Sequence, residues 1–129
     1  MTGIQIDFEA DASERPFYRH LLIELRHRLP SDLALSITAL ASWCMGDDWI
    51  EGLPVDEAVP MLYRMGPDRS TVLNHLQNGG NFRARLCRES AGISTDEPIS
   101  GLGPRRYYIF RPRAWCQSAF DQVRREVLP

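Results

Sequence analysis

The stretch Gly3-Ile4-Gln5-Ile6-Asp7-Phe8-Glu9 decides which fold the sequence predicts. Apolar side chains alternate with polar ones, and this period of two is typical of a β-strand. The polar face holds Gln5, Asp7 and Glu9, whereas a central strand of an open parallel sheet is apolar on both faces. A strand that lines the lumen of a barrel tolerates such a face. The stretch therefore predicts a barrel strand whose carboxyl end carries two acids.

Strands and helices alternate along the rest of the chain, and alternating elements indicate an α/β protein with a parallel sheet. We therefore expect an α/β fold that is part of a (β/α)8 TIM barrel, about its C-terminal half (units four to eight). In this interpretation residues 1–129 form a single partial barrel domain, because a whole barrel needs roughly 200–250 residues. The periodicity predicts further strands over 33–40, 57–65, 91–95 and 107–110, and helices over 13–29, 41–50, 67–77 and 112–127.

Composition removes several classes of protein. The 129 residues carry 15 basic and 17 acidic side chains, and the formal net charge of −2 gives no overall attraction to nucleic acid. No apolar run reaches about 18 residues, so we expect no transmembrane helix. The first residues lack the pattern of a signal peptide. Localisation stays open, since an export signal upstream of Met1 is compatible with this sequence.

The cysteines and histidines predict neither a metal site nor a cofactor. Cys44, Cys87 and Cys116 are widely spaced and form no C-x-x-C pair, so a zinc ribbon or a redox dithiol is not indicated. The three histidines form no ligand pair of the H-E-x-x-H kind. We expect all three cysteines to be free thiols, buried or partly exposed.

The first strand also resembles the fourth-strand motif of family 18 chitinase-like glycosidases, which runs glycine, any, aspartate, any, aspartate, any, glutamate. Glu9 matches the family's proton-donating glutamate and Asp7 its neighbouring aspartate, while Gln5 stands where an aspartate is usual. Met61-Leu62-Tyr63-Arg64 resembles the sixth-strand Met-any-Tyr-Asp of that superfamily, with Arg64 in place of the aspartate.

A closer resemblance covers nearly the whole chain and rests on residues 5–8, 36–44, 53–61 and 92–98. These segments resemble a bacterial domain-of-unknown-function family labelled DUF3142, whose members resemble glycosidase-type barrels and have no assigned substrate. The resemblance implies that this chain is the C-terminal half of such a member.

Candidate site residues follow from these resemblances and from the ends of the expected strands. Glu9 is expected to be the general acid/base, Asp7 to orient it or tune its pKa, and Tyr63 to assist at the reacting centre. Other residues near or after strand ends are expected to bind substrate, because barrel sites are assembled there. The alternatives to these functional roles are structural: Asp7 and Glu9 are then solvated acids at a strand end, and Trp43 is a packing residue. The substrate-binding candidates are Gln5, Trp43, Arg64, Asp96 and Glu97.

Three functional interpretations remain open at this point. The first is an uncharacterised glycosidase-like protein that hydrolyses or binds carbohydrate. The second is a non-catalytic glycan- or protein-binding module, which Gln5 and Arg64 favour because both replace expected acids. The third is a truncated gene product without independent activity. The expected partner is a missing N-terminal half-barrel or a second copy, because the strands at 3–9 and 107–110 would leave two unpaired edges.

Overall fold

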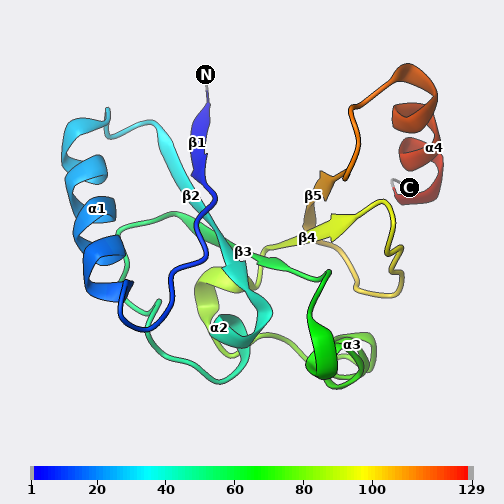
Figure 1. Ribbon diagram of the computed structural model, residues 1–129, viewed down its shortest axis with the longest axis horizontal. Helices are drawn as coiled ribbons and strands as arrows, with labels where there is room; N and C mark the ends of the chain where they lie inside the picture. The colour runs from blue at the N-terminus through cyan, green and yellow to red at the C-terminus, as the bar shows by residue number, and fades with distance from the viewer. Residues whose placement is uncertain (1, 128–129) are drawn as a thin grey trace.

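The computed structural model describes residues 2–127, with side chains to residue 125, and its centre is a single β-sheet. All its strands are parallel, and each pairs with the next in the sequence (Figure 1). The sheet is curled into the shape of a half-barrel. Its strands are β1 (Gly3–Ile6), β2 (Ala34–Leu40), β3 (Glu57–Met61), β4 (Ser90–Ser94) and β5 (Arg106–Phe110).

Four α-helices accompany the sheet in the described part of the chain. Figure 1 shows α1 beside the β1–β2 end of the sheet and α4 beside β5 at the other end. Helix α1 buries Tyr18 and Leu22 in a core that also holds Leu35 and Ile37 of β2. The helices are α1 (Arg15–Arg28), α2 (Ala41–Met45), α3 (Arg69–Gln77) and α4 (Gln117–Val127), and short 3-10 turns occur at Gly66–Asp68 and Arg85–Cys87.

The expected α/β class and parallel sheet are present, but the assignment to units four to eight of a (β/α)8 barrel is wrong. The chain forms a small α/β domain with an open five-stranded sheet. A (β/α)8 barrel follows every strand with a helix of its own. Here the helix that follows β2 has only five residues, and none lies between β4 and β5 in the described structure. Alternation of elements predicted the parallel pairing, but it does not set the number of strands or the closure of the sheet.

A disulfide joins Cys44 of α2 to Cys87 of the second 3-10 turn, with their Cα atoms 5.9 Å apart. The expectation of free thiols is therefore wrong for these two residues and holds for Cys116, which is free and exposed. The partners lie 43 positions apart in the sequence, so only the tertiary fold brings them together. Sequence alone does not reveal cysteine connectivity.

The outermost strands β1 and β5 each present one unpaired edge, as the sequence predicted. Exposed strand edges favour pairing with another chain. Self-association of the purified chain therefore stays a prediction, and sedimentation velocity at several concentrations checks it. A single monomeric species across the concentration range would contradict it.

Tyr18 supplies a stability prediction, because its buried hydroxyl finds no hydrogen-bond partner in the described part of the chain. Burial, with a smaller effect from the charge of Asp7, raises the pKa of Tyr18 from 10.0 to about 12. The folded protein holds this proton more tightly than the unfolded chain, so stability is lost as the pH rises above 10. Tyr18→Phe is expected to raise the free energy of unfolding by about 1 kcal/mol at neutral pH. The difference in unfolding free energy between Tyr18→Phe and the unmodified protein should grow between pH 10 and pH 12.

Urea denaturation at several pH values measures this effect. Tyr107→Phe is the matched control, because the Tyr107 hydroxyl donates a hydrogen bond to the carbonyl oxygen of Gly103 at 2.8 Å. That control should lose stability rather than gain it. Equal responses of the two variants would show that the Tyr18 hydroxyl carries no burial cost.

Candidate functional site

The two faces of the sheet differ in chemistry. On one face Leu35, Ile37 and Ala39 of β2 are fully buried in the core. The opposite face is polar along β2, where Ser36 and Thr38 alternate with those core residues. Because side chains on neighbouring parallel strands align by register, polar residues of five strands gather on this second face. We call it the polar face.

The amino-terminal part of the polar face is organised around Glu57, the first residue of β3, which is only 7% exposed. Arg106 of β5 donates from Nη2 to Glu57 Oε2 at 2.6 Å. The Tyr108 hydroxyl and the Ser36 hydroxyl both donate to Glu57 Oε1, the latter at 3.2 Å. Gln5 of β1 extends the network by donating to Ser36 Oγ at 3.1 Å. One carboxylate thus links side chains of four strands.

A cavity of about 440 Å³ lies beside this network, and Gln5, Ser36, Glu57 and Arg106 line it together with Tyr108. Burial raises the pKa of Tyr108, and its hydrogen bond to Glu57 and the charge of Glu57 add to the effect. The same carboxylate raises the pKa of Arg106. The cluster therefore keeps a protonated tyrosine and a guanidinium pointed at one carboxylate.

The carboxyl-terminal part of the polar face holds the expected catalytic candidates. Asp7, just after β1, accepts a hydrogen bond from Thr38 Oγ1 at 2.8 Å. Tyr63, just after β3, packs its ring against Phe110 at the end of β5, with 5.7 Å between the ring centroids. Burial raises the pKa of the Tyr63 hydroxyl. The charge of Asp7 and, more weakly, that of Glu9 add to this shift, so both carboxylates lie within electrostatic reach of the tyrosine.

The loop after β3 and the loop after β4 meet beside this tyrosine. Arg64 has a φ of 53°, in the left-handed region that non-glycine residues rarely adopt. Its backbone N–H donates to Glu97 Oε2 at 3.0 Å, which ties the two loops together. Asp96 accepts a hydrogen bond from the Ser94 hydroxyl. Within the described residues the Arg64 side chain forms no ion pair with an acid.

The structure brings Asp7, Glu9, Tyr63 and Arg64 together, and it places Asp96 and Glu97 on the adjoining loop. Gln5 lies on the same face but further toward the amino ends of the strands. Trp43 is not at this site. It is 2% exposed and packs in the core edge-to-face against Trp49, at 4.8 Å between centroids. The short helix α2 turns the indole ring of Trp43 into the hydrophobic core.

Sequence reasoning missed most of the polar-face residues that form the hydrogen-bond network. Except for Glu57 of β3, their alternation with the core-facing residues of β2 and β5 was a readable signal, since every second residue of a strand shares a face. That signal does not say which residues of different strands stand side by side, because the cross-strand register is a tertiary property. The missed residues of the network are Ser36, Thr38, Glu57, Arg106 and Tyr108.

Cys116, outside the polar face, is expected to be a reactive thiol. The Ser118 hydroxyl, and then the backbone N–H of Ala119 and the guanidinium of Arg111, lower the pKa of Cys116 from 9.0 to about 7. Because the thiolate is the nucleophile, alkylation by iodoacetamide should rise with a midpoint near pH 7 in the folded protein.

Mass spectrometry of the alkylated chain measures this profile. Ser118→Ala should move the midpoint upward, since the largest stabilising contact of the thiolate is removed. Cys44 and Cys87 should stay unmodified without reductant, because they are paired. A midpoint equal to that of the urea-unfolded chain would contradict the prediction.

In the described residues no helix is long and apolar enough to cross a membrane, and no group of three or more acidic, histidine or cysteine side chains is placed to hold a metal ion.

Comparison with known proteins finds a family model that matches part of the chain. The family model described as Domain of unknown function (DUF3142) matches residues 1–64, which include β1, β2, β3 and the candidates Asp7, Glu9, Tyr63 and Arg64. No curated protein and no solved structure matches the chain. The resemblance expected over nearly the whole chain is therefore found for its first half, and residues 1–64 are similar to the domain of unknown function DUF3142.

Proposed function

We propose that the polar face binds carbohydrate at its carboxyl-terminal part. The observation that carries this proposal is the pair of rings, Tyr63 and Phe110, beside hydrogen-bonding groups on one face of the sheet. A sugar ring has apolar C–H faces that stack on aromatic rings and a rim of hydroxyls that need donors and acceptors. A binding site of this kind combines aromatic surface with a few placed polar groups.

The polar groups suited to sugar hydroxyls are Asp7, Glu9 and Arg64. Asp7 is held in place by Thr38, whereas Glu9 is exposed and forms no hydrogen bond within the described structure. Asp7 is thus an acceptor of fixed orientation, and Glu9 is an acceptor that is free to turn. Such a pair suits a ligand with several hydroxyl groups that donate hydrogen bonds. The site would therefore orient a sugar through Asp7 and close on it with Glu9 and Arg64.

A catalytic form of this proposal makes Glu9 the general acid/base of a glycosidase. Asp7 would then tune Glu9 or orient it, and Tyr63 would assist at the reacting centre. The raised pKa of Tyr63 supports this form, because the hydroxyl stays protonated beside two carboxylates and remains a hydrogen-bond donor.

A second candidate is a binding module without turnover. The exposure of Glu9 favours it, since a catalytic acid that must hold a proton is usually enclosed in an apolar environment. Gln5 also favours it. Its side chain donates a hydrogen bond to Ser36, and it supplies no carboxylate at the position where the glycosidase motif has an aspartate.

A glycan array combined with a hydrolysis screen of the same glycans tests the proposal. We expect binding to a neutral glycan that falls at least tenfold in Tyr63→Ala, because one stacked ring is lost. Phe17→Ala is the matched control, since Phe17 is a 62% exposed ring on α1, away from the polar face. Binding that is absent for every glycan, or equally affected by both variants, would overturn the proposal.

Glu9→Gln separates the two forms of the proposal. Loss of hydrolysis with binding retained would establish the catalytic form, with Glu24→Gln as the control for an acid on α1. Binding without cleavage in the unmodified protein would establish the binding module instead. Full hydrolysis by Glu9→Gln would exclude Glu9 as the acid/base.

A further inference from the structure

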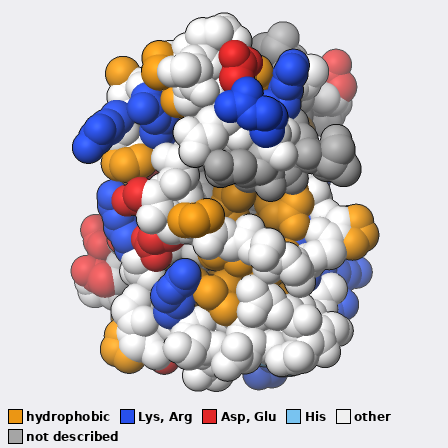
Figure 2. Space-filling model, turned by 90° about the vertical axis from the view of Figure 1, so that its right-hand side faces the viewer, with side chains coloured by type: hydrophobic (Ala, Val, Ile, Leu, Met, Phe, Trp, Pro, Cys, Tyr) orange, Lys and Arg blue, Asp and Glu red, His pale blue; other side chains and the backbone are white. Residues whose placement is uncertain are grey.

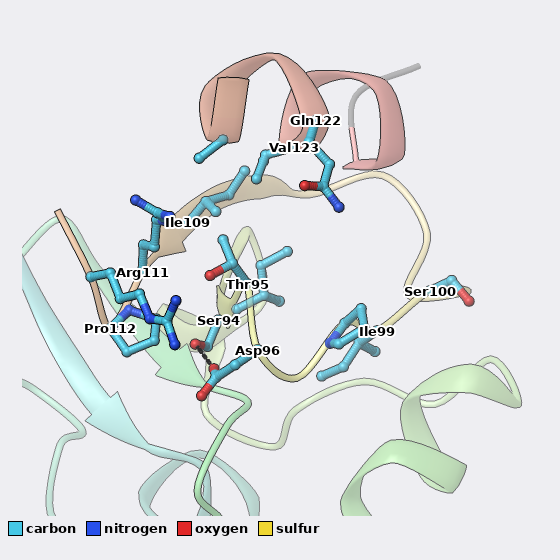
Figure 3. Close-up of a pocket in the computed structure, with 14 residues that line it drawn as sticks. Ser94, Thr95, Asp96, Ile99, Ser100, Ile109, Arg111, Pro112, Gln122 and Val123 are labelled. Carbon is cyan, nitrogen blue, oxygen red and sulfur yellow. Dashed lines mark hydrogen bonds between the residues drawn. The ribbon is translucent and has the colours of Figure 1, made fainter. Parts of the chain in front are cut away.

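A second cavity, of about 880 Å³, opens beside β4 and β5, where α4 stands over the outer part of the sheet (Figure 3). It is twice the size of the cavity next to Glu57 and lies within the size range of small-molecule sites. Figure 2, which faces this side of the molecule, shows apolar side chains on the floor of a hollow. None of the residues proposed above to bind carbohydrate lines it, although Asp96, a substrate-binding candidate of the sequence analysis, does.

The cavity has mixed walls, in which aliphatic side chains from four segments stand among polar ones such as Ser94, Thr95 and Ser100. Ile93 of β4 and Ile109 of β5 form the sheet side, and Val123 of α4 stands opposite them. Ile99, in the loop after β4, lies toward one end of the cavity in Figure 3. Four branched aliphatic side chains around one open cavity favour an apolar ligand, whose burial stabilises a complex by roughly 25 cal/mol per Å².

The other end of the cavity is cationic. Arg111 and Arg113 line it around Pro112, and Figure 3 shows Arg111 and Pro112 on the side away from Ile99. Neither guanidinium forms an ion pair with an acid in the described part of the chain. Arg111 lies over the ring of Trp115, at 5.9 Å from its centroid, and its guanidinium also acts on the Cys116 thiol, which lies outside the cavity lining.

Asp96 is the acid among the lining residues, and its carboxylate accepts a hydrogen bond from the Ser94 hydroxyl. The lining side chains thus carry two positive charges and one negative charge. The two arginines lie at the end opposite Ile99. The cavity therefore has a cationic end and an aliphatic end, which matches a ligand with an anionic headgroup and an apolar chain. An anionic headgroup fits the arginines, and its chain fits the isoleucines and Val123.

We propose that this cavity binds a single-chain aliphatic carboxylate, with the headgroup at Arg111 and Arg113 and the chain along Ile109 and Val123 toward Ile99. Guanidinium groups bind carboxylates through charge-assisted hydrogen bonds, which are stronger than neutral ones. The site is separate from the carbohydrate site on the polar face, and neither proposal depends on the other.

Isothermal titration of the whole chain with dodecanoate, kept below its critical micelle concentration, tests the proposal. We expect saturable binding of dodecanoate and weaker binding of 1-dodecanol, which has the same chain without the charge. Replacing both arginines by alanine should weaken dodecanoate binding at least tenfold and leave dodecanol binding unchanged. Arg124→Ala is the matched control, because Arg124 is an exposed arginine of α4 that does not line the cavity.

Val123→Trp fills the apolar part of the cavity and should abolish binding of both ligands. Circular dichroism and the melting temperature of each variant confirm that it is folded. Absence of dodecanoate binding, or equal binding in the variant that lacks both arginines, would overturn the proposal. So would a sedimentation result in which Val123→Trp dissociates an oligomer that dodecanoate leaves intact, since the cavity would then be an interface between copies.

Discussion

Replacing Cys44 and Cys87 together by alanine is expected to lower the free energy of unfolding by roughly 4 kcal/mol. The disulfide links positions 43 apart, so it closes a long loop that contains β3 and α3. A cross-link of that span removes many conformations of the unfolded chain, which is the main source of its stabilising effect. Both half-cystines are fully buried, so the double variant also loses packing at this point of the core.

Urea denaturation of the double variant measures this effect, and the midpoint should fall by roughly 2 M. Reduction of the unmodified protein by dithiothreitol should give a similar decrease. Cys116→Ala is the matched control, because Cys116 is exposed and unpaired, and it should leave the midpoint unchanged. The prediction fails if reduction and the double variant both leave the unfolding curve unaltered.

Glu57→Ala is expected to lower the free energy of unfolding by roughly 3 kcal/mol. The substitution leaves the Tyr108 hydroxyl and Arg106 Nη2 without the acceptor that the structure supplies. The Arg106 side chain is 60% exposed and recovers part of its hydration. The loss should therefore fall at the lower end of the range for a broken buried ion pair.

Thermal and urea unfolding of Glu57→Ala, Arg106→Ala and the double variant measure the coupling between the two side chains. We expect the double variant to be more stable than the sum of the single losses predicts, because it leaves no uncompensated charge. Glu89→Ala, an exposed acid just before β4, is the control and should change stability by less than about 0.5 kcal/mol. A Glu57→Ala loss no larger than that of the control would show that the network does not hold the strands together.

Much of the secondary structure was predictable, because strong periodicity has a local cause. Ile4 and Ile6 in β1 and the stripe of leucines in α1 follow the repeat of their own element, so their positions needed no tertiary information. The observed element boundaries differ from the predicted ones where tertiary contacts determine the end of an element. The first strand was expected to run to Glu9 but ends at Ile6, where the chain leaves the sheet toward α1.

The candidate site was predictable only in part. Alternation placed Gln5, Asp7 and Glu9 on one face, and the structure keeps Asp7 and Glu9 within electrostatic reach of Tyr63. Trp43 could not be placed from its position after β2, because a short helix can turn a ring inward or outward. The Trp43 ring points into the core, because burial of the indole against Trp49 removes a large apolar surface from water.

The sequence by itself determined the α/β class, the parallel sheet, the order of elements and the polar side of the first strand. These properties depend on repeats of two and of about 3.6 residues, which act over one element at a time. Only the tertiary structure decided that the chain forms a small α/β domain and not units four to eight of a (β/α)8 barrel, that Cys44 pairs with Cys87, and that Glu57 joins four strands. Those features depend on register and packing between segments tens of residues apart, and no local pattern records that register.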